Sequence, residues 1–381
     1  MIKRKGIIGI LVLILLLFTG QTALANTDFD VSADSAVIME ASTGQMLFQK
    51  NADSPIPPAS ITKLMTLIVA FEALESGEVD WDDKVTISEE AWSMGGSQMF
   101  LEIGQEVTFG DLITGISVVS ANDACVAVAE HLYGSEAAFT NVMNQRATEL
   151  GLTNSRFQNS TGLPAPGHEM SARDIATMAQ YLITTFPKIL ELESMQEFTY
   201  NDIRQYNRNP LLGRYPGADG LKTGWTSEAG YCLVGTAEQN EKRLISVVLN
   251  TASDQARLTA SRELLDHGFY NFQLRDIVQA NQIMGEVAIA DGRQHVLPIS
   301  VQDQISMFIP TGREGDLEFV VLESEALKAP VTAGTPITTL DIKLDGEVLS
   351  SIELVAAEDM KRANIFVRMF RAIGSFFSNL F

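Results

Sequence analysis

The chain has 381 residues, of which 48 are Asp or Glu and 27 are Lys or Arg, giving a formal net charge of −21. This excess of acid argues against nucleic acid as a partner, because binding to phosphates needs a basic surface. Hydrophobic residues make up 46% of the chain, enough to bury a sizeable core, and the length suggests about two domains.

Residues 1–25 are typical of a signal peptide. Basic residues at positions 3–5 precede an apolar run over residues 7–18, and the small residues around Ala25 suit a signal-peptidase site. The alternative is a permanent membrane anchor, although the apolar run is rather short for a span. Removal of three positive charges would take the net charge from −21 to −24. We therefore expect the protein to be exported and to act outside the cytoplasm.

The next elements are a β-hairpin and a helical region. Residues 36–39 and 46–48 are short apolar runs, and a turn separates them, which predicts a hairpin. From about residue 60 to about residue 200 the pattern is mostly helical, with loops marked by Gly and Pro.

The helical region opens with two prolines, a serine and a lysine. Pro57 and Pro58 indicate a helix start, because proline in the first turn loses no helical hydrogen bond, and Gly77 indicates the end. On that helix Ser60 and Lys63 share a face. The lysine amine can take the serine proton if burial or nearby positive charge lowers its pKa. The alternative is a helix cap beside a solvated lysine.

A second serine stands before a later predicted helix. Ser120 and Asn122 lie where a loop enters the helix expected over residues 124–132. A serine hydroxyl can relay a proton, and an asparagine amide can both donate and accept hydrogen bonds. The alternative is a plain helix N-cap, which Ser and Asn both favour.

A third polar group precedes β-prone runs over residues 231–236 and 244–249, which predict antiparallel strands. Lys222 supplies a positive charge and Thr223 a hydroxyl, and Gly224 would let a substrate lie close to the strand backbone.

The domain organisation follows from these patterns. An amphipathic helix is expected over about residues 254–272. Strands at both ends of the region, with helices between them, predict one α+β domain over residues 28–273, in which the early hairpin joins the later strands. Short alternating runs split by turns then predict an all-β domain over residues 275–357, and its expected role is that of a stalk or spacer.

The cysteines and histidines suggest no further chemistry. Cys125 and Cys232 both lie in apolar segments, so buried free thiols are the plainer interpretation, although an exported protein could join them in one disulfide. The four histidines show no ligand spacing, and we expect neither a metal nor a cofactor. They are at positions 131, 168, 267 and 295.

Together the three polar groups form a recognisable set. Ser-x-x-Lys at Ser60, Ser-x-Asn at Ser120 and Lys-Thr-Gly at Lys222 follow in the order typical of penicillin-binding proteins and serine β-lactamases. The mature chain, from about residue 28 to its end, resembles the low-molecular-mass penicillin-binding proteins that are D-alanyl-D-alanine carboxypeptidases. Further stretches that carry this resemblance are residues 120–125, 149–154, 171–174, 208–209 and 227–231.

The resemblance implies a penicillin-binding, serine β-lactamase-like fold and a serine peptidase reaction. Ser60 would attack the penultimate D-alanine of a peptidoglycan stem pentapeptide and become acylated, with Lys63 as the base. Ser120 would relay a proton to the leaving amine of the terminal D-alanine. Water would then hydrolyse the acyl-enzyme, and penicillin would block the enzyme covalently.

The resemblance also implies binding roles. Asn122 would hold the substrate amide, and Lys222 and Thr223 would bind the terminal carboxylate. The backbone N–H groups of Ser60 and Trp225 would hold the oxyanion. Arg257 lies where the family often places a further carboxylate-binding arginine, and a helix-surface charge is the alternative. Trp225 departs from the pattern, because relatives often have smaller or imidazole side chains there, so its indole would narrow the cleft.

Two other functions remain possible at this point. A class A β-lactamase would need a loop glutamate in a Glu-x-x-x-Asn pattern, and the stretch 158–174 contains Glu169 without that pattern. The other is a non-catalytic β-lactam sensor or wall-binding scaffold, and the intact Ser60, Asn122 and Lys222 argue against such a loss of catalysis.

The C-terminal segment, residues 358–381, predicts an amphipathic helix. Large apolar side chains recur at helical spacing, four basic residues accompany them, and no acid occurs from residue 361 onwards. Such a helix suits a membrane surface, on the outer face of the cytoplasmic membrane, and its interior charges argue against a span. The alternative is a helix packed on the protein's own core. The apolar residues are Ile365, Phe366, Met369, Phe370, Ile373, Phe376, Phe377 and Leu380, and the basic ones are Lys361, Arg362, Arg368 and Arg371.

Overall fold

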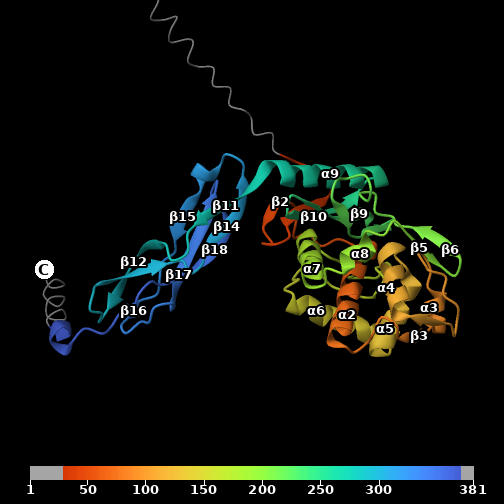
Figure 1. Ribbon diagram of the computed structural model, residues 1–381, viewed down its shortest axis with the longest axis horizontal. Coiled ribbons are helices and arrows are strands. Elements are labelled where there is room, and N and C mark those ends of the chain that lie inside the picture. Colours follow the sequence, from red (N-terminus) through yellow and green to blue (C-terminus); the bar gives the residue numbers. More distant parts are fainter. Residues whose placement is uncertain (1–28, 370–381) are drawn as a thin grey trace, which may run out of the picture. The chain divides into compact units, whose positions relative to one another are not determined.

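The structure, a computed structural model, describes residues 29–369 (Figure 1). The expected signal peptide and the end of the expected C-terminal helix, residues 370–381, lie outside the described residues. None of the helices between residues 29 and 369 has the length and apolar composition that crossing a membrane requires.

The first part is built on one antiparallel sheet with the strand order β2-β1-β10-β9-β7, and β8 also pairs with β9. As expected from the sequence, the early hairpin joins the late strands, because β1 pairs along its length with β10. The strands are β1 (Ser35–Glu40), β2 (Met46–Lys50), β7 (Ala218–Gly220), β8 (Thr223–Thr226), β9 (Gly230–Gln239) and β10 (Lys242–Thr251).

Both faces of this sheet are covered, so its central strands are apolar on both sides. Val37 and Val247 pair with each other and face the core shared with the helical region. Ile38 and Leu244 point the other way, under Gly268 of the helix α9 (Asp254–Asn271), where a glycine permits close packing. Figure 1 shows α9 on one side of the sheet and the remaining helices on the other.

The helical region lies between β2 and β7 in the chain. Its central element is a 3₁₀ turn, η1 (Ala59–Thr62), which continues directly into α2 (Lys63–Ser76). Gly77 ends α2 in the left-handed conformation expected of a glycine C-cap. The other helices are α3 (Glu89–Ser93), α4 (Phe109–Val118), α5 (Asn122–Tyr133), α6 (Glu136–Glu149), α7 (Ala172–Thr185) and α8 (Ile189–Glu193). Two small hairpins are β3 (Lys84–Thr86) with β4 (Glu106–Thr108), and β5 (Glu197–Tyr200) with β6 (Ile203–Tyr206).

The second part is all β, as the alternating pattern predicted, and its first strand follows α9 without a linker. A sheet of order β15-β17-β18-β13-β12-β16 and the pair β11-β14 enclose an aliphatic core that includes Leu297, Ile299, Leu340 and Leu354. The elements are β11 (Phe272–Val278), β12 (Ile283–Ala290), β13 (Val296–Ser300), β14 (Ile305–Pro310), η2 (Glu314–Asp316), β15 (Glu318–Val321), β16 (Leu327–Lys328), β17 (Pro336–Leu344) and β18 (Glu347–Ala356).

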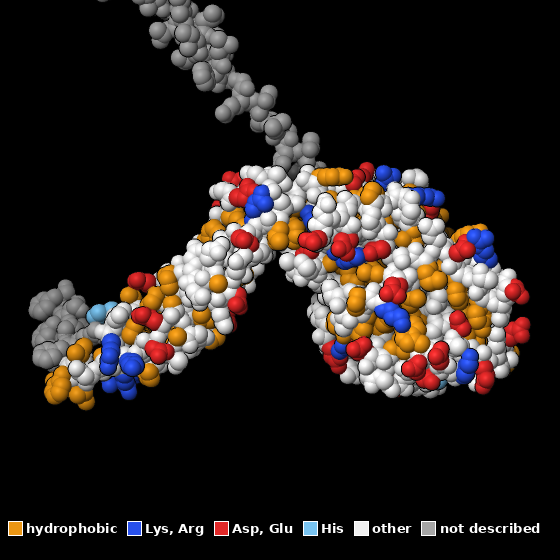
Figure 2. Space-filling view, viewed as in Figure 1, with side chains coloured by type: hydrophobic (Ala, Val, Ile, Leu, Met, Phe, Trp, Pro, Cys, Tyr) orange, Lys and Arg blue, Asp and Glu red, His pale blue; other side chains and the backbone are white. Residues whose placement is uncertain are grey.

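The chain after β18 stays with the β domain for several residues. Met360 is buried and pairs its backbone with Val331, and the backbone N–H of Ala363 donates to Asp291. Helical backbone begins at residue 365, later than the start at 358 that the sequence suggested. Figure 2 shows acidic side chains spread over the visible face, as the net charge predicts.

Candidate active site

Ser60 and Lys63 meet as the i, i+3 spacing predicted. Ser60 lies on the 3₁₀ turn and Lys63 is the first residue of α2, so both side chains leave the same end of the helix. The Lys63 Nζ lies 3.0 Å from the Ser60 Oγ. It is also 2.7 Å from the Asn122 Oδ1 and 2.6 Å from the Thr161 carbonyl oxygen. The interpretation as a helix cap with a solvated lysine is therefore wrong, because Lys63 is fully buried.

Burial also decides the charge of this lysine. Removing an ammonium group from water disfavours its protonated form, and the positive charges of Lys222 and Arg208 add to that effect. Together they lower the pKa of Lys63 to about 8. A lysine with that pKa can exist as the neutral amine at a useful fraction near neutral pH, and the neutral amine can accept the serine proton.

Ser120 and Asn122 come from the junction between α4 and α5. Asn122 is the first residue of α5, and its Nδ2 donates to the Gly95 carbonyl (2.7 Å) while its Oδ1 faces Lys63. Ser120 has a positive φ of 62°, which is uncommon for a residue with a side chain and often marks a functional site. Its buried Oγ has no hydrogen-bond partner among the described residues. The residue at the N-cap is Ala121, so the alternative of a plain Ser or Asn cap is wrong.

Strand β8 brings the third group to the same place. Thr223, Gly224 and Trp225 pair with Leu233, Cys232 and Tyr231 of β9. A Cβ on Gly224 would lie 2.8 Å from the Pro58 carbonyl oxygen. The glycine therefore allows β8 to pack against the turn that carries Ser60. Gly224 also lines the cleft, and the close approach of a substrate expected from the sequence stays a prediction.

Lys222 lies just before β8 and is only 3% exposed. The buried carboxyl of Glu193, at the end of α8, is its nearby counter-charge. Burial lowers the pKa of Lys222 and raises the pKa of Glu193, and the attraction between the two charges opposes both shifts. Sequence reasoning missed Glu193, because a single acid at a short helix end carries no distinctive pattern.

Two arginines complete the site. The Arg257 Nη1 donates to the carbonyls of Gly224 (3.3 Å) and Cys232 (3.2 Å), and its Nη2 pairs with Asp254. Arg257 is thus buried, holds β8 through its hydrogen bonds and also lines the cleft. The alternative of a charge on the helix surface is wrong. Arg208 donates to the Ser97 Oγ (2.7 Å) across the cleft. In the sequence analysis Arg208 only carried part of the resemblance and had no predicted role.

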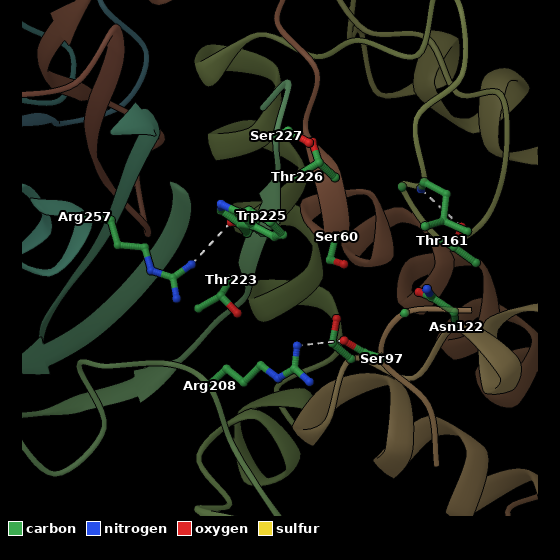
Figure 3. Close-up of a pocket in the computed structure, with 15 residues that line it drawn as sticks. Ser60, Ser97, Asn122, Thr161, Arg208, Thr223, Trp225, Thr226, Ser227 and Arg257 are labelled. Atoms are coloured by element: carbon green, nitrogen blue, oxygen red, sulfur yellow. Dashed lines mark hydrogen bonds between the residues drawn. The ribbon is translucent and has the colours of Figure 1, made fainter. Parts of the chain in front are cut away.

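Most of these side chains line one cleft of about 540 Å³ (Figure 3), whereas Lys63, Lys222 and Glu193 are buried and are not among its lining residues. Figure 3 shows Ser60 between Trp225 and Thr223 on one side and Asn122 and Thr161 on the other. Trp225 is 57% exposed, so its indole forms part of the wall. The cleft is large enough for a short peptide. Its other lining residues are Gly96, Ser97, Ser120, Gly162, Leu163, Arg208, Gly224, Thr226, Ser227 and Arg257.

The arrangement is suited to acyl transfer. A serine hydroxyl touches a buried amine of lowered pKa, a second hydroxyl lies beside the cleft, and buried cations lie on the side of β8. Between residues 29 and 369, no three His, Cys, Asp or Glu side chains gather as a metal site. Cys125 and Cys232 are buried free thiols, which confirms the plainer interpretation of the sequence.

Comparison with known proteins agrees with this geometry. The family model described as D-alanyl-D-alanine carboxypeptidase matches residues 21–253, and the model of the penicillin-binding protein 5 C-terminal domain matches residues 272–362. The chain is 38% identical to the D-alanyl-D-alanine carboxypeptidase DacF of Bacillus subtilis over 94% of this chain and 93% of the relative.

Solved structures give the same result. Penicillin binding protein 5 from Haemophilus influenzae is 35% identical and superposes with a TM-score of 0.76, covering 88% of this chain and 99% of that one. Penicillin-binding protein D2 from Listeria monocytogenes, solved in an ampicillin-bound form, is 33% identical with a TM-score of 0.58 and covers 64% of this chain and 99% of its own. The chain therefore belongs to the D-alanyl-D-alanine carboxypeptidase family.

Proposed function

We propose that this protein is a serine D-alanyl-D-alanine carboxypeptidase that removes the terminal D-alanine from peptidoglycan stem pentapeptides. The observation that carries the proposal is the 3.0 Å contact between the buried Lys63 Nζ and the Oγ of Ser60, a residue that lines the 540 Å³ cleft. Membership of the family and the ampicillin-bound relative support both the reaction and covalent inhibition by penicillin.

Acylation begins with the neutral amine of Lys63. It takes the proton of the Ser60 hydroxyl as the oxygen attacks the carbonyl carbon of the penultimate D-alanine. The backbone N–H groups of Ser60 and Trp225 donate to the oxygen that becomes negative. Ser120 relays the proton taken up by Lys63 to the amine of the terminal D-alanine, the C–N bond breaks, and Lys63 is again neutral. Free D-alanine leaves, and water later hydrolyses the ester on Ser60.

Substrate binding uses the remaining residues. The Asn122 amide holds a backbone amide of the stem peptide, and Lys222 and Thr223 bind the terminal carboxylate. Arg257 contributes a second positive charge on that side, although its guanidinium already donates to two strand carbonyls and Asp254. Gly224 lets β8 approach the turn of Ser60 closely enough for Trp225 to take part in the oxyanion site.

The β-lactamase alternative is less well supported. Glu169, the only glutamate of the stretch 158–174, is exposed, and its backbone pairs with Arg156. A non-catalytic wall-binding scaffold would not need a lysine held against a serine by burial and two further acceptors.

We also propose that the protein is exported and held at the outer face of the cytoplasmic membrane by its C-terminal helix. The sequence of residues 1–25 supports export. Exposed apolar side chains at the start of the helix support surface attachment, because Ile365 is 71% exposed and Phe366 67%. The β domain would then act as a spacer between the membrane and the Ser60 cleft.

One pair of assays tests the proposed reaction. Purified protein should release D-alanine from a peptide ending in D-Ala-D-Ala, and it should hydrolyse a β-lactam far more slowly. The Ser60→Ala variant should lose both D-alanine release and covalent labelling by penicillin, because the acyl bond needs that oxygen. Labelling that persists in the variant, or β-lactam turnover faster than D-alanine release, would contradict the proposal.

A further inference from the structure

His168 is a buried side chain that the reaction described above does not use. It closes the loop of residues 158–168, which forms the wall of the cleft at Thr161 and Gly162. Its Nδ1 lies 3.3 Å from the backbone nitrogen of Gln158, at the other end of the same loop. Its Nε2 lies 2.8 Å from the Thr62 Oγ1, in the turn that carries Ser60.

The hydrogen bonds around His168 fix the position of its proton. The Thr62 hydroxyl donates its only hydrogen to the Ala59 carbonyl oxygen (2.9 Å), so the Thr62 Oγ1 can only accept from the histidine. The backbone N–H of Gln158 donates to Nδ1, which must therefore carry no proton. His168 is thus neutral and protonated at Nε2, and the three hydrogen bonds run in one direction, from Gln158 to Ala59.

This chain of hydrogen bonds ends at Ala59, a strained residue beside the nucleophile. Ala59 precedes Ser60 and has a positive φ of 48°, which residues with a Cβ rarely adopt unless neighbouring groups enforce it. The loop packs closely against the same carbonyl. Only a glycine fits at position 162, because a Cβ there would lie 1.9 Å from the Ala59 oxygen. The loop also presents the Thr161 carbonyl to the Lys63 Nζ.

We propose that His168 is a positioning residue for acylation: through Thr62 it holds the Ala59 carbonyl, so that Ser60, the next residue, keeps its geometry relative to Lys63. His168 touches neither reacting atom. The inference rests on the proposed function, since it assigns a part in the acylation of Ser60. Burial and the charge of Lys63 lower the pKa of His168 to about 4, which agrees with the neutral ring that this hydrogen-bond chain requires.

Two substitutions separate positioning from simple core packing. In His168→Gln the amide nitrogen reaches the place of Nε2 and can still donate to Thr62. In His168→Asn the amide oxygen reaches the place of Nδ1 and can still accept from Gln158, but the donor to Thr62 is lost. Both variants replace the imidazole by an amide, so each serves as the control for the other.

The measurement is the second-order rate of Ser60 acylation by a fluorescent penicillin, with thermal midpoints recorded for every variant. We expect His168→Gln to stay within about threefold of the unaltered protein and His168→Asn to fall about 10- to 100-fold, as expected when a reacting group is slightly misplaced. Thr62→Val, which removes the hydroxyl at nearly constant volume, should fall by the same factor. The double variant His168→Asn/Thr62→Val should fall no further than either single change.

The outcomes distinguish the inference from the proposed function. Unaltered protein that neither reacts with penicillin at Ser60 nor releases D-alanine would remove the proposed function and the inference with it. If the unaltered protein reacts with penicillin at Ser60 and the His168→Asn variant is acylated at the same rate, only the inference about His168 is overturned. Equal losses in the Gln and Asn variants, or fully additive losses in the double variant, would do the same. If His168→Asn does not fold, the Thr62→Val variant alone tests the inference, and an unchanged rate of Ser60 acylation in that variant overturns it.

Discussion

Lys63 is subject to two opposing influences. Three acceptors surround its Nζ, the Ser60 Oγ, the Asn122 Oδ1 and the Thr161 carbonyl oxygen, and an ammonium group with three hydrogens would satisfy them all. Burial and the neighbouring cations favour the neutral amine and lower the pKa to about 8. The same side chain can therefore hold its position as an ammonium and act as a base once the proton is lost.

This balance predicts the pH dependence of acylation. Below its pKa only the neutral fraction of Lys63 can act, so the rate should rise about tenfold per pH unit up to about pH 7 and level off above the pKa of about 8. Penicillin acylation rates measured between pH 5.5 and 9.5 would show this. In Lys63→Arg the rate should be negligible throughout, because arginine stays protonated. A flat profile, or near-normal acylation by the Arg variant, would show that another group takes the proton.

Lys222, unlike Lys63, lies beside a buried acid, Glu193. Lys222 is only 3% exposed and Glu193 is fully buried, so each charge depends on the other. Neither Glu193 oxygen has a well-formed hydrogen bond among the described residues, and the Ser117 hydroxyl lies close by. Removal of Lys222 alone would leave a buried acid that must take up a proton to remain in place.

We predict that Lys222→Gln weakens recognition of substrates with a free terminal carboxylate more than of their esters. The carboxylate loses its charge partner, whereas the ester has none to lose, so kcat/KM should fall at least about tenfold more for the acid, in line with the strength of a buried charged hydrogen bond. The double variant Lys222→Gln/Glu193→Gln is the control, because it removes the unpaired acid and should recover thermal stability without recovering this selectivity. Equal losses for acid and ester would place the carboxylate elsewhere.

At the scale of elements, the site depends on a loop packed against a turn. Gly162 has a φ of 83°, and its Cα faces the Ala59 carbonyl so closely that a Cβ would lie 1.9 Å from that oxygen. Gly151 has a similar φ of 74°, but a Cβ there would have no atom within 4 Å. Substitution of Gly151 would therefore introduce backbone strain alone, whereas substitution of Gly162 would add a collision with the turn that carries Ser60.

We predict that Gly151→Ala destabilises the protein by about 1–2 kcal/mol through left-handed backbone strain, and that Gly162→Ala destabilises it by more, because its methyl group also collides with the Ala59 carbonyl. Only Gly162→Ala should also slow acylation, by about tenfold or more, because its methyl group must displace Ala59 next to Ser60. Chemical denaturation gives the first quantity and penicillin acylation the second. Normal acylation by a folded Gly162→Ala protein would show that the turn tolerates movement of the loop.

Sequence reasoning located the parts of this site that side-chain patterns encode. The contact of Ser60 with Lys63 follows from a three-residue spacing, and the pairing of β1 with β10 follows from strands that need partners. Contacts made by the backbone were not predictable. The Thr161 carbonyl faces Lys63, but every residue has a backbone carbonyl, so the residue type gives no signal of this contact. The close contact of Gly224 with the backbone of Pro58 was not predictable for the same reason.

At the scale of the whole molecule, the end of the chain divides into two segments. The segment up to Ala363 belongs to the β domain by its backbone pairing and by the burial of Met360. Beyond it, Ile365, Phe366 and Met369 are exposed. Two of the basic residues already have a partner, because Arg362 and Arg368 lie 3.2 and 3.0 Å from the Asp291 carboxylate. Anionic lipid would compete with Asp291 for these charges, so apolar burial should supply most of the attachment.

We therefore predict that a chain of residues 26–363 stays in solution and still releases D-alanine, whereas residues 26–381 bind to vesicles containing anionic phospholipid. Each fully buried large apolar side chain adds about 1.5–3 kcal/mol and each basic residue about 1 kcal/mol, enough for reversible attachment. A full-length variant with Ile365, Phe366 and Met369 changed to Ser is the control. It keeps every charge and should float with vesicles much less than the unaltered chain. Equal flotation of all three proteins, or of none, would rule out the helix as an anchor. Flotation of the serine variant that equals the unaltered chain and disappears at high salt would instead assign attachment to charge alone.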